Sequence, residues 1–158
     1  MKPMHYALGV LAAITTGTIL SNEYAGYSDR KRVETLKARP ITDDLVIHRF
    51  IVPSHKARST PLVTITYHAA DTYNAGFSAS VTADDGTTVC SNTSGKGGGG
   101  MQFPSRMTPV LRVPLAKLTG PECQLPPGSY SLAVRFNVLI DGVVKSISAE
   151  SERFRVTE

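Results

Sequence analysis

The stretch from Cys90 to Ser105, CSNTSGKGGGGMQFPS, places a glycine run around one lysine, a composition that phosphate-binding loops share. A P-loop requires G-x-x-x-x-G-K-[ST], and alignment on Gly95 and Lys96 puts cysteine at the first glycine and glycine at the Ser/Thr position. The dinucleotide pattern G-x-G-x-x-G is matched, but it also needs a helix to follow, and Pro104 stands there instead. We therefore predict an exposed, flexible loop with no catalytic role and no cofactor.

Two alternatives remain for this loop and the residues beside it. The loop could order against a protein partner, with Lys96, Met101 and Phe103 as contacts. The only two cysteines, Cys90 and Cys123, flank it and predict a disulfide in an oxidising compartment. Such a bridge would contribute roughly 3–4 kcal/mol by restricting the unfolded chain. The alternative is a pair of independent thiols in a reducing compartment.

Other residue types that carry chemistry do not form a catalytic pattern. His48 and His68 would come near each other in a hairpin of two neighbouring strands, but no third ligand accompanies them, so no metal site is predicted. Paired carboxylates for glycan cleavage are missing, and Glu122 stands alone. We predict that the protein is not an enzyme.

The positive charge is concentrated at the N-terminus. The chain has a net charge of +4. Residues 1–40 hold six Lys or Arg and three Asp or Glu, whereas residues 41–158 hold eleven and ten. Because a nucleic-acid surface needs clustered cations on the domain itself, no nucleic-acid partner is predicted.

Residues 1–27 contain an apolar run, YALGVLAAITTGTILSNEYAGY, without a charge from Pro3 to Asn22. Tyr6 and Tyr24 are eighteen residues apart, roughly 27 Å along a helix and close to the ~30 Å of a bilayer core. The interpretation is an uncleaved transmembrane signal anchor bound to membrane lipid, with tyrosines at its interfaces (Tyr6, Tyr24 and Tyr27). A cleaved signal peptide is the first alternative, and a buried helix of a soluble core is the second.

Residues 28–44 are predicted to form a basic juxtamembrane linker. Ser28 could cap a short helix and Pro40 would end it. Arg30, Lys31 and Arg32 would then lie near anionic lipid headgroups.

From Leu45 onward the apolar residues alternate with period two, which predicts an all-β domain over residues 45–158. Turn sequences separate the runs, and Asp141-Gly142 marks a tight hairpin. The predicted strands are 45–52, 62–69, 76–83, 108–115, 129–140, 143–149 and 153–157. Short antiparallel strands at this spacing indicate a β-sandwich.

The segment LPPGSYSLAVRF, residues 125–136, resembles the turn and central strand of immunoglobulin-like and fibronectin type III-like domains. The resemblance covers the last third of the chain. It implies an immunoglobulin-like antiparallel β-sandwich in which the hydroxyl of Tyr130 bonds to backbone a few residues upstream. The chain departs from antibody domains because it has no tryptophan and a different cysteine spacing.

The two signals for membrane orientation disagree. Lys2 precedes the apolar run, whereas five cations follow it within residues 30–39, a bias that favours a cytoplasmic C-terminal domain. The cysteine pair favours export. We give the cysteines priority and predict a single-pass protein whose domain lies on the periplasmic or extracellular side.

The sequence thus predicts a non-catalytic, membrane-tethered interaction or scaffold module with an unidentified protein partner, as an accessory subunit of an envelope or membrane complex. The alternative is a structural protein of a bacteriophage virion. A glycan-binding or glycan-cleaving domain has less support.

Overall fold

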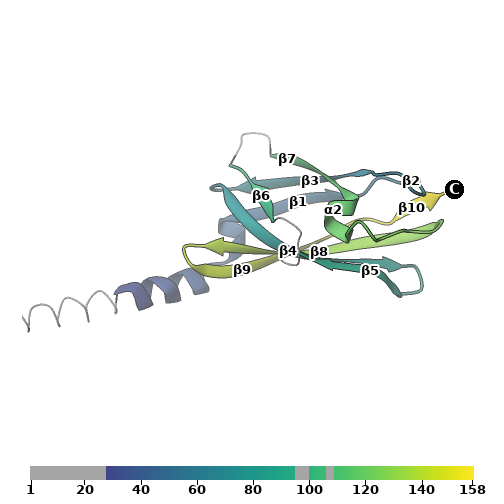
Figure 1. Ribbon diagram of the computed structural model, residues 1–158. Coiled ribbons are helices and arrows are strands. Elements are labelled where there is room, and N and C mark those ends of the chain that lie inside the picture. Colours follow the sequence, from purple (N-terminus) through teal and green to yellow (C-terminus); the bar gives the residue numbers. More distant parts are fainter. Residues whose placement is uncertain (1–27, 95–99, 106–108) are drawn as a thin grey trace, which may run out of the picture. The chain divides into compact units, whose positions relative to one another are not determined.

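The computed structural model describes residues 28–94, 100–105 and 109–158. The chain divides into two compact units, Met1–Arg39 and Pro40–Glu158, and each is described by itself. Figure 1 shows the second unit as two layers of strands, with the ends of the strands gathered at two poles of the unit.

The first unit is helical over residues 28–38. Ser28 is already inside this helix, so its predicted role as a cap is wrong, whereas the helix does end before Pro40. The side chains of Arg30, Lys31 and Arg32 are exposed.

The predicted transmembrane helix and its interfacial tyrosines, Tyr6, Tyr24 and Tyr27, lie outside the described residues. Within the part of the chain that the structure describes, no helix combines the length and the apolar character needed to cross a bilayer.

The second unit consists mainly of strands joined by short connections. Its elements are η1 (Ile41–Asp43), β1 (Leu45–Ile51), β2 (His55–Lys56), β3 (Leu62–Ala69), β4 (Tyr73–Ala83), β5 (Thr88–Thr93), β6 (Met101–Phe103), β7 (Val110–Pro114), α2 (Leu115–Thr119), β8 (Gly128–Ile140), β9 (Val143–Glu150) and β10 (Phe154–Thr157). All seven predicted strands are present with small changes of boundary. The sequence analysis missed β2, β5, β6 and the short helix α2.

The strands form two sheets. The smaller has the order β1-β3-β7, and the larger has the order β2-β10-β8-β4-β5, with β6 on β4 and β9 on β8. The pairing of β2 with β10 is parallel, and the other pairings among the described strands are antiparallel. The predicted combination of mostly antiparallel strands in two layers is therefore confirmed.

One hydrophobic core lies between the two sheets. Alternate residues of β8 are buried from Tyr130 to Ile140, as the period-two pattern predicts. Across the layers the ring of Tyr67 on β3 meets Phe103 edge-on at 5.1 Å, and Phe103 meets Phe136 on β8 at 5.2 Å, both between ring centroids. Met101 and Phe103 are thus core residues at 2% and 0% exposure. Their proposed role as partner contacts is wrong, because β6 turns both side chains inward.

A buried ion pair ties the start of the second unit to its penultimate strand. The ammonium of Lys145 on β9 lies 3.3 Å from a carboxylate oxygen of Asp44, which precedes β1, and both side chains are buried. The Tyr73 hydroxyl donates to the other carboxylate oxygen at 3.5 Å. A desolvated pair of this kind is strongly destabilising when one member is lost. The end of the unit at which the chain enters therefore lies beside the β8–β9 turn.

Candidate functional site

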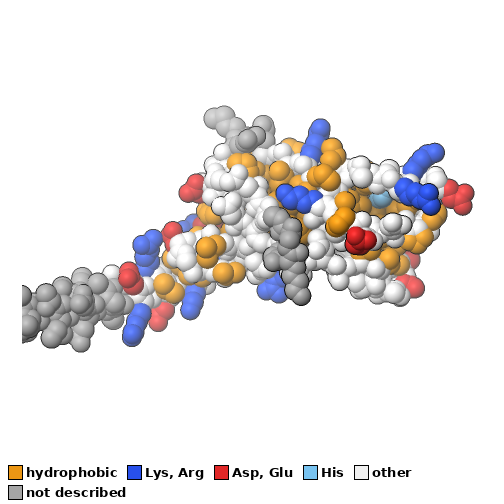
Figure 2. Space-filling view, in the orientation of Figure 1, with side chains coloured by type: hydrophobic (Ala, Val, Ile, Leu, Met, Phe, Trp, Pro, Cys, Tyr) orange, Lys and Arg blue, Asp and Glu red, His pale blue; other side chains and the backbone are white. Residues whose placement is uncertain are grey.

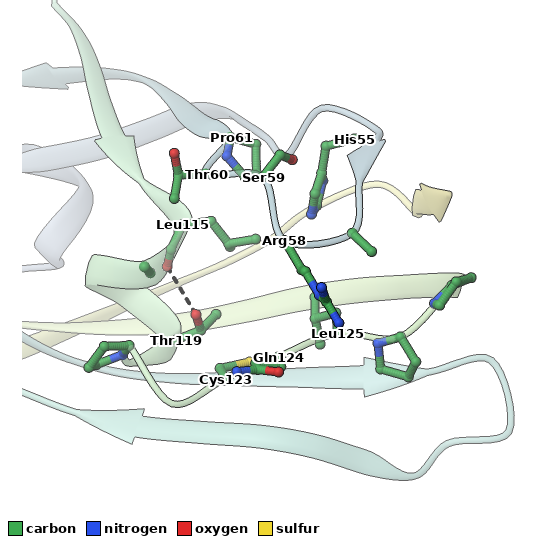
Figure 3. Close-up of a pocket in the computed structure, with 15 residues that line it drawn as sticks. His55, Arg58, Ser59, Thr60, Pro61, Leu115, Thr119, Cys123, Gln124 and Leu125 are labelled. Carbon is green, nitrogen blue, oxygen red and sulfur yellow. Dashed lines mark hydrogen bonds between the residues drawn. The ribbon is translucent and has the colours of Figure 1, made fainter. Parts of the chain in front are cut away.

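A cavity of about 680 Å³ opens at the other end of β8. Figure 3 shows its lining, which comes from the turn after β2, from α2 and from the segment between α2 and β8. This volume lies within the range of roughly 300–1,000 Å³ that holds small ligands or a few residues of a peptide. On the face drawn in Figure 2, Lys and Arg side chains lie beside a histidine and apolar surface at the end that carries β2 and β10.

The first wall of the cavity is fixed to the C-terminal strand. His55 pairs with Val156 in the parallel ladder, and its ring stacks on Phe154 with 5.7 Å between centroids. The amide of Ala57 donates to the Thr157 carbonyl at 2.7 Å. These contacts hold the turn that follows β2 in one place.

One disulfide and three hydrogen bonds hold the second wall of the cavity in place. The disulfide between Cys90 and Cys123 joins it to β5, and the Nδ2 of Asn92 on β5 donates to the Leu118 carbonyl at 3.0 Å. Within the wall, the Cys123 amide donates to the Gly120 carbonyl at 3.2 Å. At its far end the Tyr130 hydroxyl donates to the Pro126 carbonyl at 2.9 Å, the bond that the sequence predicts for a tyrosine corner.

Glycine gives the Tyr130 ring room beside this last bond. A Cβ added to Gly128 would stand 2.9 Å from the Tyr130 hydroxyl oxygen, so any other residue would push the ring away from Pro126. The Pro-Pro-Gly sequence at 126–128 thus serves the wall of the cavity as well as the start of β8.

Arg58 is the most unusual residue of the cavity. It is the third residue of a turn that the Ser59 amide closes on the Lys56 carbonyl at 3.1 Å, and its φ is 63°. Turns with a positive φ at this position normally have glycine or asparagine there, because a Cβ crowds the backbone. Residues with such strained backbone recur at ligand-binding sites, where the side chain has a functional role.

The side chain of Arg58 extends across the cavity toward Gln124 and Leu125 in Figure 3. Within residues 28–94, 100–105 and 109–158, no hydrogen bond or ion pair satisfies its guanidinium. Among the described residues that line the cavity, Arg58 and His55 are the ionisable ones, and none is acidic. The Nδ1 of His55 lies 2.9 Å from the Pro53 carbonyl. Arg58 is exposed, so its guanidinium is solvated, and it gives the cavity one positive charge with no carboxylate among the described residues of the lining.

The rest of the lining is mixed in character. Apolar surface comes from two leucines, two alanines and four prolines: Leu115, Leu125, Ala57, Ala116, Pro61, Pro121, Pro126 and Pro127. Hydroxyl groups come from Ser59, Thr60 and Thr119. Two of them are already engaged, since Ser59 donates to the Lys56 carbonyl and Thr119 to the Leu115 carbonyl. Such a surface suits a ligand with both apolar and polar groups.

The residues singled out from the sequence are only partly brought together. Cys123 and Tyr130 support one cavity wall, whereas Lys96 lies outside the described residues. His48 and His68 are both exposed, and a bulge at His48 shifts the β1–β3 register between them. In the described part of the chain, no three His, Cys, Asp or Glu side chains form a group that could hold a metal ion.

Sequence analysis missed Arg58 and the cavity around it. The available signal was the segment SHKARST at 54–60, a turn between two strands that contains no glycine, proline or asparagine. This signal is weak, because type I turns accept most residue types and do not need a positive φ.

Comparison with known proteins adds no family assignment: no family model matches this chain, and no curated protein is significantly similar to it.

Proposed function

We propose that this protein is a non-catalytic interaction module, tethered to a membrane by its N-terminal segment, that serves as an accessory subunit of an envelope or membrane protein complex. The observation that carries the proposal is the cavity with the unpaired Arg58. A stabilising alternative, glycine, is available at this turn position, and the chain instead keeps a cation that has no partner within the described residues. Non-glycine residues with strained backbone recur at ligand-binding sites.

The location of the cavity supports the proposal. The chain enters the second unit at the β8–β9 turn, where Asp44 meets Lys145, and the cavity lies where β8 begins at Gly128. The thirteen residues of β8 separate these two poles by about 40 Å at ~3.3 Å per residue. A site at the pole opposite the point of entry is accessible to a partner while the N-terminus is anchored.

The strand order supports an immunoglobulin-like identity for the second unit. In that architecture the first, second, fourth and fifth strands in sequence form one sheet and the third, sixth and seventh form the other, and the sheet β1-β3-β7 lacks a counterpart of the fourth strand. The orders β1-β3-β7 and β4-β8-β9 correspond to those two sets once β5 and β6 are taken as additions to the edge of β4. The Tyr130 hydroxyl bond to Pro126 fits the same architecture.

The disulfide supports export of the second unit. A bridge between Cys90 and Cys123 persists in oxidising compartments and is reduced in the cytosol. We therefore place the cavity on the periplasmic or extracellular side of the membrane, with Arg30, Lys31 and Arg32 near the lipid surface.

Site-specific photo-cross-linking in the native host tests this function. A photoreactive residue at exposed Gln124, inside the cavity, is expected to capture an envelope or membrane protein. The same residue at Val144, which is 65% exposed at the opposite pole, serves as the control. Capture of capsid or tail proteins would replace the proposal with a virion protein, and equal capture from both positions would refute the cavity as the contact. Intact-mass measurement of the mature chain tests the tether, because loss of the first twenty-odd residues would contradict a retained anchor.

A further inference from the structure

We infer that the cavity around Arg58 recognises a carboxylate on an otherwise apolar peptide segment of the protein partner. The inference depends on the proposed function, since it specifies what the interaction module binds. It follows from the charge of the cavity, from the chemistry of its walls and from the conformation of Arg58.

The charge selects a carboxylate over a phosphate. The planar guanidinium of Arg58 can donate two parallel hydrogen bonds to one carboxylate, and a single negative charge matches it. A phosphate group carries more charge and is usually held by several cations or by the first amides of a long helix. Among the described residues of the lining, Arg58 is the one Lys or Arg side chain.

The mixed chemistry of the cavity walls favours a peptide ligand over an alkyl-chain ligand. Leucine and proline side chains provide apolar surface on both sides of Arg58, and Ser59, Thr60 and Gln124 provide hydrogen-bonding groups among them. An alkyl chain would cover these polar groups without pairing them, which is unfavourable. A peptide can pair them through its backbone while its side chains contact the prolines.

The backbone at Arg58 fixes the point from which the guanidinium extends. The turn is closed by the Ser59 amide on Lys56, and the preceding Ala57 is bonded to β10, so the Cα of Arg58 has little freedom. Preorganisation of this kind reduces the entropy lost when a ligand binds.

Two sources of the carboxylate are compatible with this chemistry, a glutamate side chain and a free peptide C-terminus. Fluorescence anisotropy with the full-length chain in detergent micelles distinguishes them. The probes are a labelled leucine-rich pentapeptide with one central glutamate and an amidated C-terminus, the same peptide with glutamine, and a labelled tri-leucine with either a free or an amidated C-terminus. We expect at least tenfold tighter binding of the glutamate or the free-carboxylate probe than of its neutral counterpart.

The variants locate the binding. Arg58→Gln is expected to remove the tenfold preference, and Arg58→Lys to retain part of it, because lysine keeps the charge without the bidentate geometry. Arg112→Gln makes the same charge change on the outer face of β7 and is expected to have no effect. Because Arg58→Gly relieves backbone strain, loss of binding in that variant cannot be attributed to unfolding.

Equal binding of charged and neutral probes, or an unchanged preference in Arg58→Gln, would overturn the inference. Tighter binding of octanoate than of either peptide would overturn the peptide class. The proposed function fails separately: cross-linking at Gln124 that persists in Arg58→Gln keeps the interaction module and rejects the carboxylate, whereas absence of cross-linking rejects the module itself.

Discussion

Replacing Arg58 by glycine is expected to stabilise the second unit. A residue with a Cβ at a φ of 63° costs about 1–2 kcal/mol relative to glycine in the same conformation. Glycine also gives the unfolded chain more conformational freedom, and this reduces the gain in stability by about 0.4–1 kcal/mol. Arg58→Gly should therefore raise the free energy of unfolding by about 0.5–1 kcal/mol, or the melting temperature by about 2–4 °C for a domain of this size.

Alanine at the same position separates the backbone from the side chain. Arg58→Ala removes the guanidinium and keeps the Cβ, so its free energy of unfolding should stay within about 0.5 kcal/mol of the parent. The Arg58→Gly variant should thus be more stable than the Arg58→Ala variant. At Arg112, in the middle of β7, the order should be reversed, because glycine in a strand is less stable than alanine by roughly 0.5–1 kcal/mol.

Urea unfolding followed by far-UV circular dichroism measures the four variants under one condition. If Arg58→Ala proves as stable as Arg58→Gly, the backbone at this turn is not strained. The argument that the arginine is retained for binding would then lose its basis.

Three further predictions concern the remaining parts of the domain. Lys145→Met should lower the free energy of unfolding by about 3–5 kcal/mol because it removes the ammonium that neutralises the buried Asp44 carboxylate. The double replacement with Asp44→Leu should recover most of the loss, and equal loss in both variants would contradict a coupled pair. The bridge between Cys90 and Cys123 spans 33 residues, so its reduction should lower the free energy of unfolding by about 4 kcal/mol. Thiol labelling in intact cells before and after a reductant shows whether the bridge is formed, and ready labelling without reductant would refute export. Gly100→Ala should lower the melting temperature by several degrees, since its Cβ would lie 2.9 Å from the Ala75 carbonyl oxygen, whereas Gly86→Asn, at a positive φ in open space, should change it little.

The sheets were largely predictable from the sequence because their signal is local. Strands with one buried face alternate apolar and polar residues, and β3 and β8 follow this rule at most positions. The missed strands lack that signal. Edge strand β5 is polar and exposed on most positions, and β2 has only two residues.

The cavity was not predictable in the same way because it depends on distant segments. Its two walls come from the turn around Arg58 and from residues 115–127, which no local pattern links. The sequence did predict two of its supports, the disulfide and, through the resemblance to immunoglobulin-like domains, the Tyr130 bond, but neither was linked to a cavity. The positive φ of Arg58 could not be predicted from the residue type, because glycine or asparagine is the residue expected at such a position.

The position of the cavity at the pole opposite the point of entry has a mechanical consequence. If the N-terminus is anchored and a partner pulls on the turn around Arg58, tension enters the domain at both ends of β1 and acts along that strand. Because both ends of one strand are pulled, the extended backbone of β1 carries this tension, and the hydrogen bonds between β1 and β3 are not loaded in shear. A pull at right angles would open the same bonds one at a time. The domain is thus built to transmit a force along its length, and single-molecule stretching between residue 40 and residue 58 should require more force than stretching across the sheet.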